Sequence, residues 1–221
     1  MENAVDAGLH IHLLGQPRFF YKGEPYAFHS RPRALALLAF LLLHRGAHLT
    51  RDLVAFSLWA DDSEAEARAK LRRHLYQLTN ALPPSAVPYI SSVEETIGWN
   101  NGAAVWVDVD EFERCIAAES LWPDAAELYE GDLALAIYDD WIVPIRERLR
   151  RDYIGTLERL LLRARSRREF ARAVSYAERI LANDSWREDT LRQLVSIRYE
   201  SGDRAGALRE IDVLLGGFPR R

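Results

Sequence analysis

Apolar and polar residues follow a strand-like pattern over the first thirty positions. Segment 9–14 is apolar and partly alternating, Gly15-Gln16-Pro17 interrupts it, and segment 18–21 is a second short apolar run. Segment 22–25 has the composition of a turn, and 26–28 is expected to form a third strand. A sheet this small has little core of its own, so we expect it to pack on the segments that follow.

Helical periodicity replaces this pattern after residue 31. The first predicted helix, over about 32–44, is apolar nearly all round and should be central to the fold. A second begins at Thr50, a favourable N-cap residue, and ends near Trp59. A third covers about 64–82 with a narrow apolar stripe, which consists of Leu71, Leu75, Leu78 and Leu82.

Two strands around a turn at Glu94-Glu95 are predicted next, over 89–93 and 96–99, with a further strand over 105–109. After residue 108 the pattern is helical, and it repeats at an offset of 34 residues. Segment 169–174 matches 203–208 at this offset, and the leucines of 157–161 match the apolar positions of 191–195. This is the period of tetratricopeptide helix pairs, so we expect stacked helices in this part.

Charge is distributed unevenly along the 221 residues, although the net charge is only −4. Segment 31–84 carries a balance of +3, segment 85–140 a balance of −12, and segment 141–172 a balance of +6. Such segregation says more about partners than the total charge does. For the basic segment 141–172 we expect pairing with the acidic segment 85–140 of this same chain, with DNA backbone or an acidic partner as alternatives.

The order of a sheet, three helices and a strand pair resembles the OmpR type of winged helix, and the whole chain resembles the SARP type of bacterial transcriptional regulator. The first half carries the resemblance in Leu13-Leu14-Gly15, in the helix that starts Arg31-Pro32-Arg33-Ala34, in Leu58-Trp59 and in 107–112. In the second half, Tyr129-Glu130-Gly131-Asp132-Leu133, Asp139-Asp140-Trp141 and Glu147-Arg148-Leu149 resemble the bacterial transcriptional activator domain.

The resemblance implies an α+β winged-helix DNA-binding domain over 1–107 and an all-α, tetratricopeptide-like domain over 108–221. It further implies a sequence-specific, cytoplasmic transcriptional regulator, an activator, whose helical domain serves dimerisation, contact with RNA polymerase or signal input. The family's activator domain usually continues for further helices. The chain is therefore expected to be a shortened member of the family or the N-terminal piece of a larger regulator.

Side chains off the leucine stripe make the helix at about 64–82 a candidate reading helix for the major groove, where each base pair shows a distinct edge. Arg68, Arg72 and Arg73 can fork onto guanine edges or phosphates. Gln77 can pair with adenine, whereas Lys70 and Tyr76 are expected at the DNA backbone. An ordinary amphipathic surface helix with some arginines is the alternative.

Further phosphate contacts are expected from Arg31, Arg33 and Arg51, which lie at helix starts where backbone N–H groups favour anions. They can equally be solvated surface arginines. The acidic pair Glu94-Glu95 is awkward beside phosphates, so Ser91, Ser92 and Thr96 carry little weight as wing contacts. A single domain with few contacts should bind weakly, so a homodimer or tandem binding on repeated half-sites is expected.

Enzymatic and cofactor functions are not indicated. The single cysteine, Cys115, has no evident catalytic partner, no histidine pair comes with a carboxylate and a third ligand, and no glycine-rich phosphate loop is present. We expect no metal, no cofactor and no membrane segment. The main alternative to DNA binding is a helical-repeat adaptor whose winged helix binds protein, and a small-molecule sensor that uses the repeat groove is a third class.

Overall fold

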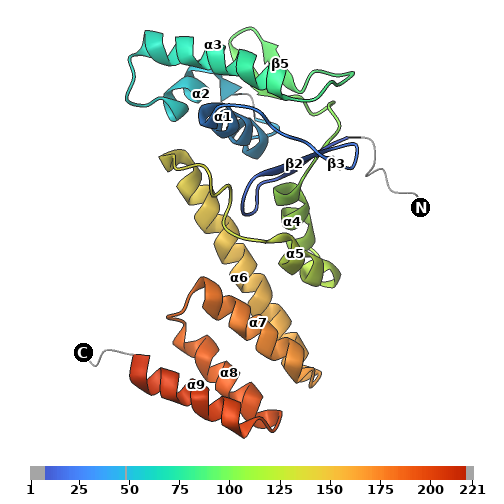
Figure 1. Ribbon diagram of the computed structural model, residues 1–221, viewed down its shortest axis with the longest axis vertical. Helices are drawn as coiled ribbons and strands as arrows, with labels where there is room; N and C mark the ends of the chain where they lie inside the picture. Colours follow the sequence, from blue (N-terminus) through green and yellow to red (C-terminus); the bar gives the residue numbers. More distant parts are fainter. Residues whose placement is uncertain (1–7, 48, 218–221) are drawn as a thin grey trace. The chain divides into compact units, whose positions relative to one another are not determined.

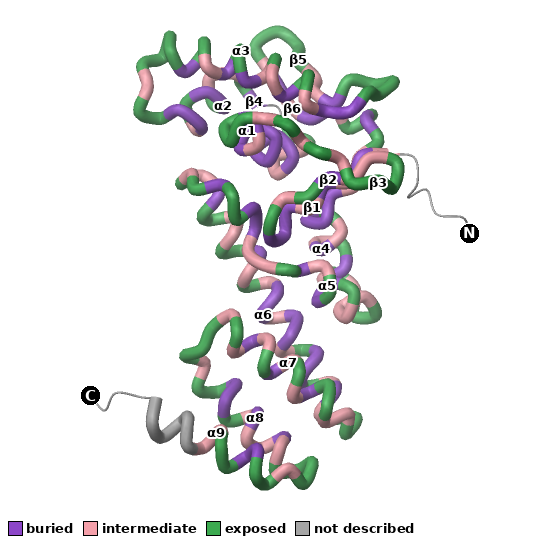
Figure 2. The backbone as a smooth tube through the Cα atoms, in the orientation of Figure 1, coloured by how far each residue is buried: buried purple, intermediate pink, exposed green. Residues whose placement is uncertain are grey.

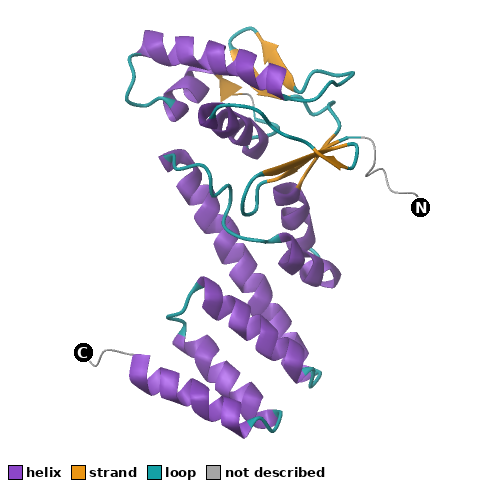
Figure 3. Cartoon of the chain, viewed as in Figure 1, coloured by secondary structure: helices purple, strands orange, loops and turns teal. Residues whose placement is uncertain are grey.

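The computed structural model describes residues 8–47 and 49–217, with side chains described through residue 211. All its named strands lie before residue 108, and helices and loops follow (Figure 3). The described chain divides into two compact units. The first contains residues up to 113 together with 128–149, and the second contains 114–127 and the residues from 150 onward.

A four-stranded sheet with the order β3-β2-β1-β7 belongs to the first unit. Strand β1 (Leu9–His12) pairs antiparallel with β2 (Arg18–Tyr21) and parallel with β7 (Val105–Val107). The parallel pairing joins segments nearly one hundred residues apart. The predicted strand over 18–21 is confirmed, the one over 9–14 is confirmed for its first four residues, and the one expected over 105–109 is confirmed for its first three residues.

The third strand is displaced from its expected position. Strand β3 consists of Glu24–Pro25, so the strand prediction for 26–28 is wrong. The backbone N–H groups of His29 and Ser30 bond to carbonyls only two residues earlier, at distances of 2.9 and 3.0 Å. These tight turns lead the chain out of the sheet and toward the first helix.

Three helices and a second sheet complete the winged-helix order (Figure 1). The helices are α1 (Pro32–Leu43), α2 (Arg51–Leu58) and α3 (Glu64–Ala81). The sheet has the order β4-β6-β5, with β4 (Leu49–Thr50), β6 (Thr96–Trp99) and β5 (Ile90–Val93). Helix α1 is buried from Ala36 to Leu42 without interruption, and both α2 and α3 pack against it (Figure 2). The prediction of a central first helix is therefore confirmed.

Capping residues fix where α2 and α3 begin. The hydroxyl of Thr50 accepts a hydrogen bond from the N–H of Leu53, as its N-cap position predicts. Ser63 and Glu66 form a reciprocal capping box at the start of α3. Both helices therefore start at defined residues, which fixes the register of the side chains along α3.

Asp108 ends β7 and begins α4 (Asp108–Ile116). Its carboxylate is completely buried and accepts hydrogen bonds from the N–H groups of Leu13 and Leu14 at 2.8 Å. This contact explains why the strand stops at Val107. Burial raises the pKa of Asp108 to about 6, although the same N–H groups and that of Val109 oppose the rise.

The loop 129–135 lies against the end of β1 in the first unit. The N–H of Ala134 donates to Leu13 O, the N–H of Leu135 to Gly15 O, and the N–H of Gly15 to Asp132 O. A Cβ at Gly131 would lie 3.4 Å from the Cα of Gly15, whose φ is +99°. Two glycines at this point therefore allow the backbones to approach closely.

The second unit holds the predicted helix pairs. Its helical segments are the second part of α6 (Val143–Ser166), α7 (Phe170–Asn183), α8 (Glu188–Glu200) and α9 (Arg204–Gly217), with α5 (Trp122–Leu128) before them. Equivalent positions of the 34-residue repeat are buried in both copies: Leu157 and Leu191, and Ala173 and Ala207. The tetratricopeptide-like prediction is confirmed for the described residues. No helix in residues 8–47 and 49–217 is long and apolar enough to span a membrane.

Ion pairs within each unit join the basic segment 141–172 to acidic residues of the chain. Arg148 pairs with Glu113 in the first unit, at 2.6 Å, and Arg163 pairs with Glu119 in the second, at 3.7 Å. Arg165 also pairs with Glu200. The expected internal pairing of this segment therefore accounts for several of its arginines, although each exposed pair contributes little stability.

Candidate nucleic-acid interface

Helix α3 has one buried face that differs from its predicted stripe by one side chain. The buried residues are Ala67, Leu71, His74 and Leu78. Leu75 is only half-buried, and the ring of His74 takes the inner position instead. That ring lies 5.1 Å from the indole of Trp59, and its Nδ1 bonds to Lys70 O at 2.8 Å. The packing against α2 and its last residues therefore rotates the anchored face toward His74.

The opposite face of α3 is open to solvent. Its exposed residues are Ala65, Ala69, Arg72, Arg73, Tyr76 and Asn80. Tyr76 is 72% exposed, and no side-chain hydrogen bond or ion pair within the described residues involves Arg72 or Arg73. The small side chains of Ala65 and Ala69 let another surface approach the axis of α3 closely. Arg72 and Arg73, beside them, have no partner within the described residues and can contact that surface.

Arg68 is held by an ion pair, unlike Arg72 and Arg73 on the same helix. Its Nε and Nη2 atoms donate to the two carboxylate oxygens of Asp52 on α2, at 2.7 and 2.8 Å. The hydrogen bond from Arg68 lowers the pKa of Asp52, and the same bond raises the pKa of Arg68. Both groups therefore remain charged at neutral pH, and Asp52 neutralises the guanidinium locally.

An Asp52→Asn substitution is expected to strengthen the binding of duplex DNA at low salt, because it removes a negative charge and releases Arg68. The plot of log affinity against log salt concentration should steepen by up to about 0.9, the value for one added phosphate contact. Fluorescence anisotropy with labelled duplex measures both effects. An Asp189→Asn variant, on α8, controls for the change in net charge, and an unchanged slope in Asp52→Asn would contradict the expectation.

Lys70 and Gln77 lie at the edge of the open face. Lys70 forms an ion pair with Asp62, in the loop between α2 and α3. The Oε1 atom of Gln77 is buried without a hydrogen-bond partner among the described residues. Neither side chain therefore projects freely as Arg72 does, and the structure separates the six candidates on α3 into free and restrained groups.

Arg51 connects α2 to the wing, the hairpin of β5 and β6. Its N–H donates to Glu95 O at 2.8 Å, and its guanidinium donates to the hydroxyl of Ser92. Glu94, at a φ of 50°, and Glu95 form the exposed turn of the hairpin. Arg51 and Arg68 thus lie beside the wing, and the tip of the wing is acidic.

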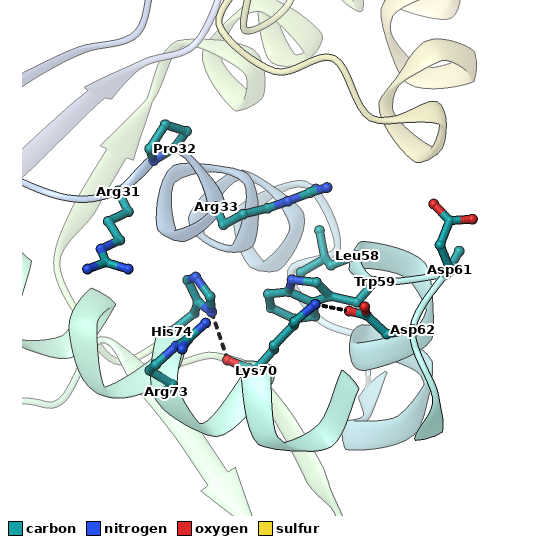
Figure 4. Close-up of a pocket in the computed structure, with 11 residues that line it drawn as sticks. Arg31, Pro32, Arg33, Leu58, Trp59, Asp61, Asp62, Lys70, Arg73 and His74 are labelled. Atoms are coloured by element: carbon teal, nitrogen blue, oxygen red, sulfur yellow. Dashed lines mark hydrogen bonds and ion pairs between the residues drawn. The ribbon is translucent and has the colours of Figure 1, made fainter. Parts of the chain in front are cut away.

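Arg31 and Arg33, the two remaining candidates, lie beside α3 in a pocket that Lys70 and Arg73 also line. Arg31, Arg33, Lys70 and Arg73 line one pocket between the start of α1 and α3, of about 480 Å³ (Figure 4). Arg33 forms an ion pair with Asp139, whereas no side-chain partner of Arg31 lies within the described residues. The structure therefore brings four of the predicted basic residues together from two helices.

Three comparisons with known proteins agree with this architecture. Residues 108–212 match the family described as bacterial transcriptional activator domain. The chain is 26% identical over 217 residues to the Regulatory protein AfsR of Streptomyces coelicolor, an alignment that covers 94% of this chain and 22% of that protein. The chain thus spans about a fifth of the length of this relative.

A solved structure of EmbR from Mycobacterium tuberculosis, in complex with a low affinity phosphopeptide, is similar in fold. The TM-score is 0.73 at 17% sequence identity, over 91% of this chain and 57% of that one. The predicted order of a winged helix and a helical domain is thereby confirmed. The chain is therefore similar in organisation to SARP-type transcriptional regulators, with a winged-helix part followed by residues that match the bacterial transcriptional activator domain.

Proposed function

We propose that the chain is a sequence-specific DNA-binding transcriptional activator without enzymatic activity. Residues 1–107 form the DNA-binding domain, in which α3 reads the major groove. Residues 108–221 serve dimerisation, contact with RNA polymerase or signal input. The observation that carries the proposal is the open face of α3, where unpaired Arg72 and Arg73 stand next to Ala69 and Tyr76.

The chemistry of this face suits base edges. A free guanidinium can donate two parallel hydrogen bonds to O6 and N7 of guanine, and each such pair discriminates by about 1 to 3 kcal/mol. Arg72 and Arg73 supply this group, and Asn80 supplies an amide that can pair with adenine. Tyr76 is placed to contact the DNA backbone. Gln77 remains a candidate for adenine only if its side chain turns its buried oxygen outward.

Restrained arginines have a positioning role in this proposal. Ser92 orients Arg51 toward a phosphate beside the wing, and Asp52 holds Arg68 next to it, where Arg68 can contact a phosphate once it exchanges Asp52 for the DNA backbone. Arg31, Arg33 and Lys70 add contacts from the other edge. So few contacts make one domain a weak binder, and we therefore propose a homodimer or tandem arrangement on repeated half-sites.

The test is a salt titration of the whole chain with a promoter fragment and with random duplex of equal length. We expect binding of both at low salt, with tighter binding of the cognate fragment. Three to five phosphate contacts predict a slope of about −3 to −4.5 for log affinity against log salt. Fluorescence anisotropy measures the affinities. A complete lack of salt-dependent binding to either duplex would contradict the proposal.

A second function is favoured by the wing. Glu94 and Glu95 at its exposed turn, next to Val93 at 62% exposure, form an acidic tip that repels phosphate and suits a protein partner. In that case the chain is a helical-repeat adaptor whose winged helix binds protein. The salt titration separates the two functions, because an adaptor shows no DNA binding at any salt concentration.

A further inference from the structure

The pocket between α1 and α3 has an excess of positive charge. Four cationic side chains and two aspartates line it (Figure 4). Asp62 pairs with Lys70, and Asp139, outside the pocket, pairs with Arg33. Arg31 and Arg73 keep their full charge, since no ion pair within the described residues involves them. Asp61 is the one acidic group of the lining left to offset both.

The start of α1 adds to this charge. Pro32 occupies the first turn of the twelve-residue helix, and Arg31 at the N-cap makes no side-chain capping bond. No acidic residue lies in the first turn. Because Pro32 has no N–H group and those of Ala34 and Leu35 bond to Arg31 O, the N–H of Arg33 is the backbone donor of this first turn that an anion can meet.

His74 gives an independent indication of a ligand. The residue is only 4% exposed, and its ring lies between the arginines and Trp59 in the wall of the pocket (Figure 4). Its Nδ1 bonds to Lys70 O, so Nε2 is the atom left to meet a ligand. No hydrogen bond to Nε2 occurs within the described residues. Because Nδ1 donates to Lys70 O, Nε2 of the neutral ring is an acceptor, and it becomes a donor to an anion when the ring is protonated.

We propose that this pocket binds a phosphate group, held by the guanidinium groups of Arg31 and Arg73 and, when the ring of His74 is protonated, by its Nε2–H group. Arginine suits phosphate because its planar fork donates two parallel hydrogen bonds to two oxygens. The volume of about 480 Å³ falls within the usual range of ligand pockets, about 300 to 1,000 Å³.

Two sources can supply this group. Arg73 belongs both to the pocket and to the open face of α3, so a phosphate of bound DNA can enter the pocket while Arg72 contacts a base. This source rests on the proposed function. The other source is a free phosphorylated molecule. Its binding would act on α3, because Arg73 and His74 of that helix line the pocket.

The ring of His74 is the reporter for the experiment. Burial lowers its pKa from the usual 6.5, and the charges of Arg73, Arg31 and Arg33 lower it further, whereas the bond to Lys70 O opposes this. Asp61 and Asp62 are the acidic groups of the same lining. A bound anion offsets the arginine charges, so it should raise the pKa of His74 and bind more tightly as the pH falls.

We would titrate the whole chain, without DNA, with inorganic phosphate at pH 7 and constant ionic strength, following the ring signals of His74 by NMR. A saturable shift is expected. Sulfate, whose charge is constant over this range, serves for the pH titration. Arg31→Gln should weaken binding of the anion about tenfold or more. Arg73→Gln is a second test, and Arg192→Gln, exposed on α8, is the charge-matched control.

The outcomes separate the pocket from the proposed function. A saturable shift that Arg31→Gln weakens supports the pocket, whether or not the chain binds DNA. If Arg31→Gln also weakens DNA binding, the DNA backbone is the source, and if DNA binding is unchanged, the source is a free phosphorylated molecule. A linear shift without saturation, or equal shifts in Arg31→Gln and Arg192→Gln, would overturn the inference.

Discussion

Replacement of both Arg72 and Arg73 by alanine is expected to abolish most of the specific DNA affinity of the chain. Arg72 at a guanine edge and Arg73 at a guanine edge or a phosphate account for about 2 to 6 kcal/mol together, so the dissociation constant for a promoter fragment should rise on the order of 30-fold or more. Binding of random duplex should weaken much less, because it depends mainly on phosphate contacts. Fluorescence anisotropy at physiological salt measures both constants.

The control for this double variant is Arg172→Ala/Arg192→Ala, which removes the same charge from exposed positions on α7 and α8. Both variants should melt at the temperature of the original chain, because all four side chains are exposed and none anchors a core. Equal affinity of the Arg72→Ala/Arg73→Ala variant and the original chain for the promoter fragment would exclude α3 as the reading helix.

Asp108→Ala is expected to destabilise the first unit more than any surface substitution. The N–H groups of Leu13 and Leu14 would lose their buried acceptor, and each unsatisfied group costs about 1 to 3 kcal/mol. The combined loss of about 2 to 6 kcal/mol is a large part of the stability of a typical domain. Urea unfolding followed by circular dichroism measures it.

The size of this loss should depend on pH. The pKa of Asp108, raised by burial to about 6, exceeds its usual 3.8, so the folded chain binds the proton more tightly than the unfolded chain does. The contribution of Asp108 to the free energy of unfolding therefore falls as the pH rises from about 4 to 6, and it is constant above that. The loss in Asp108→Ala should be about 1 kcal/mol larger at pH 5 than at pH 7.

Asp110→Ala is the matched control. Asp110 lies on the same turn of α4, and its carboxylate pairs with Arg45 at the surface, a contact worth about 0 to 1 kcal/mol. Its effect should be small at both pH values. A stability of Asp108→Ala equal to that of Asp110→Ala at pH 5 would show that the buried carboxylate is not required by the end of β1.

The elements of the fold were largely predictable, because local signals define them. Thr50 is an N-cap by residue type, and the apolar period of α3 is visible in the sequence. The parallel pairing of β1 with β7 was not predictable, since it depends on residues far apart in the chain. For the same reason the prediction of Leu75 as a core residue was wrong: the indole of Trp59 draws His74 inward instead.

The candidate interface was predictable as a list of basic residues but not as an arrangement. Nothing local to Arg68 indicates that Asp52, on another helix, holds it in a bidentate pair. The partner of Arg33 is still farther away, at Asp139. The sequence shows which basic side chains are present. Which of them are paired depends on acidic residues that only the fold brings next to them.

The main-chain bonds between residues 13–15, which follow β1, and the loop 129–135 limit how parts of this fold can be exchanged. Leu13 and Gly15 depend on Ala134, Leu135 and Asp132 for their backbone partners. A recombination event at residue 107 that transplanted the preceding residues alone would leave these groups, and the acceptor role of Asp108, without matching residues in the recipient. An exchange that keeps these backbone groups bonded would have to extend through residue 135.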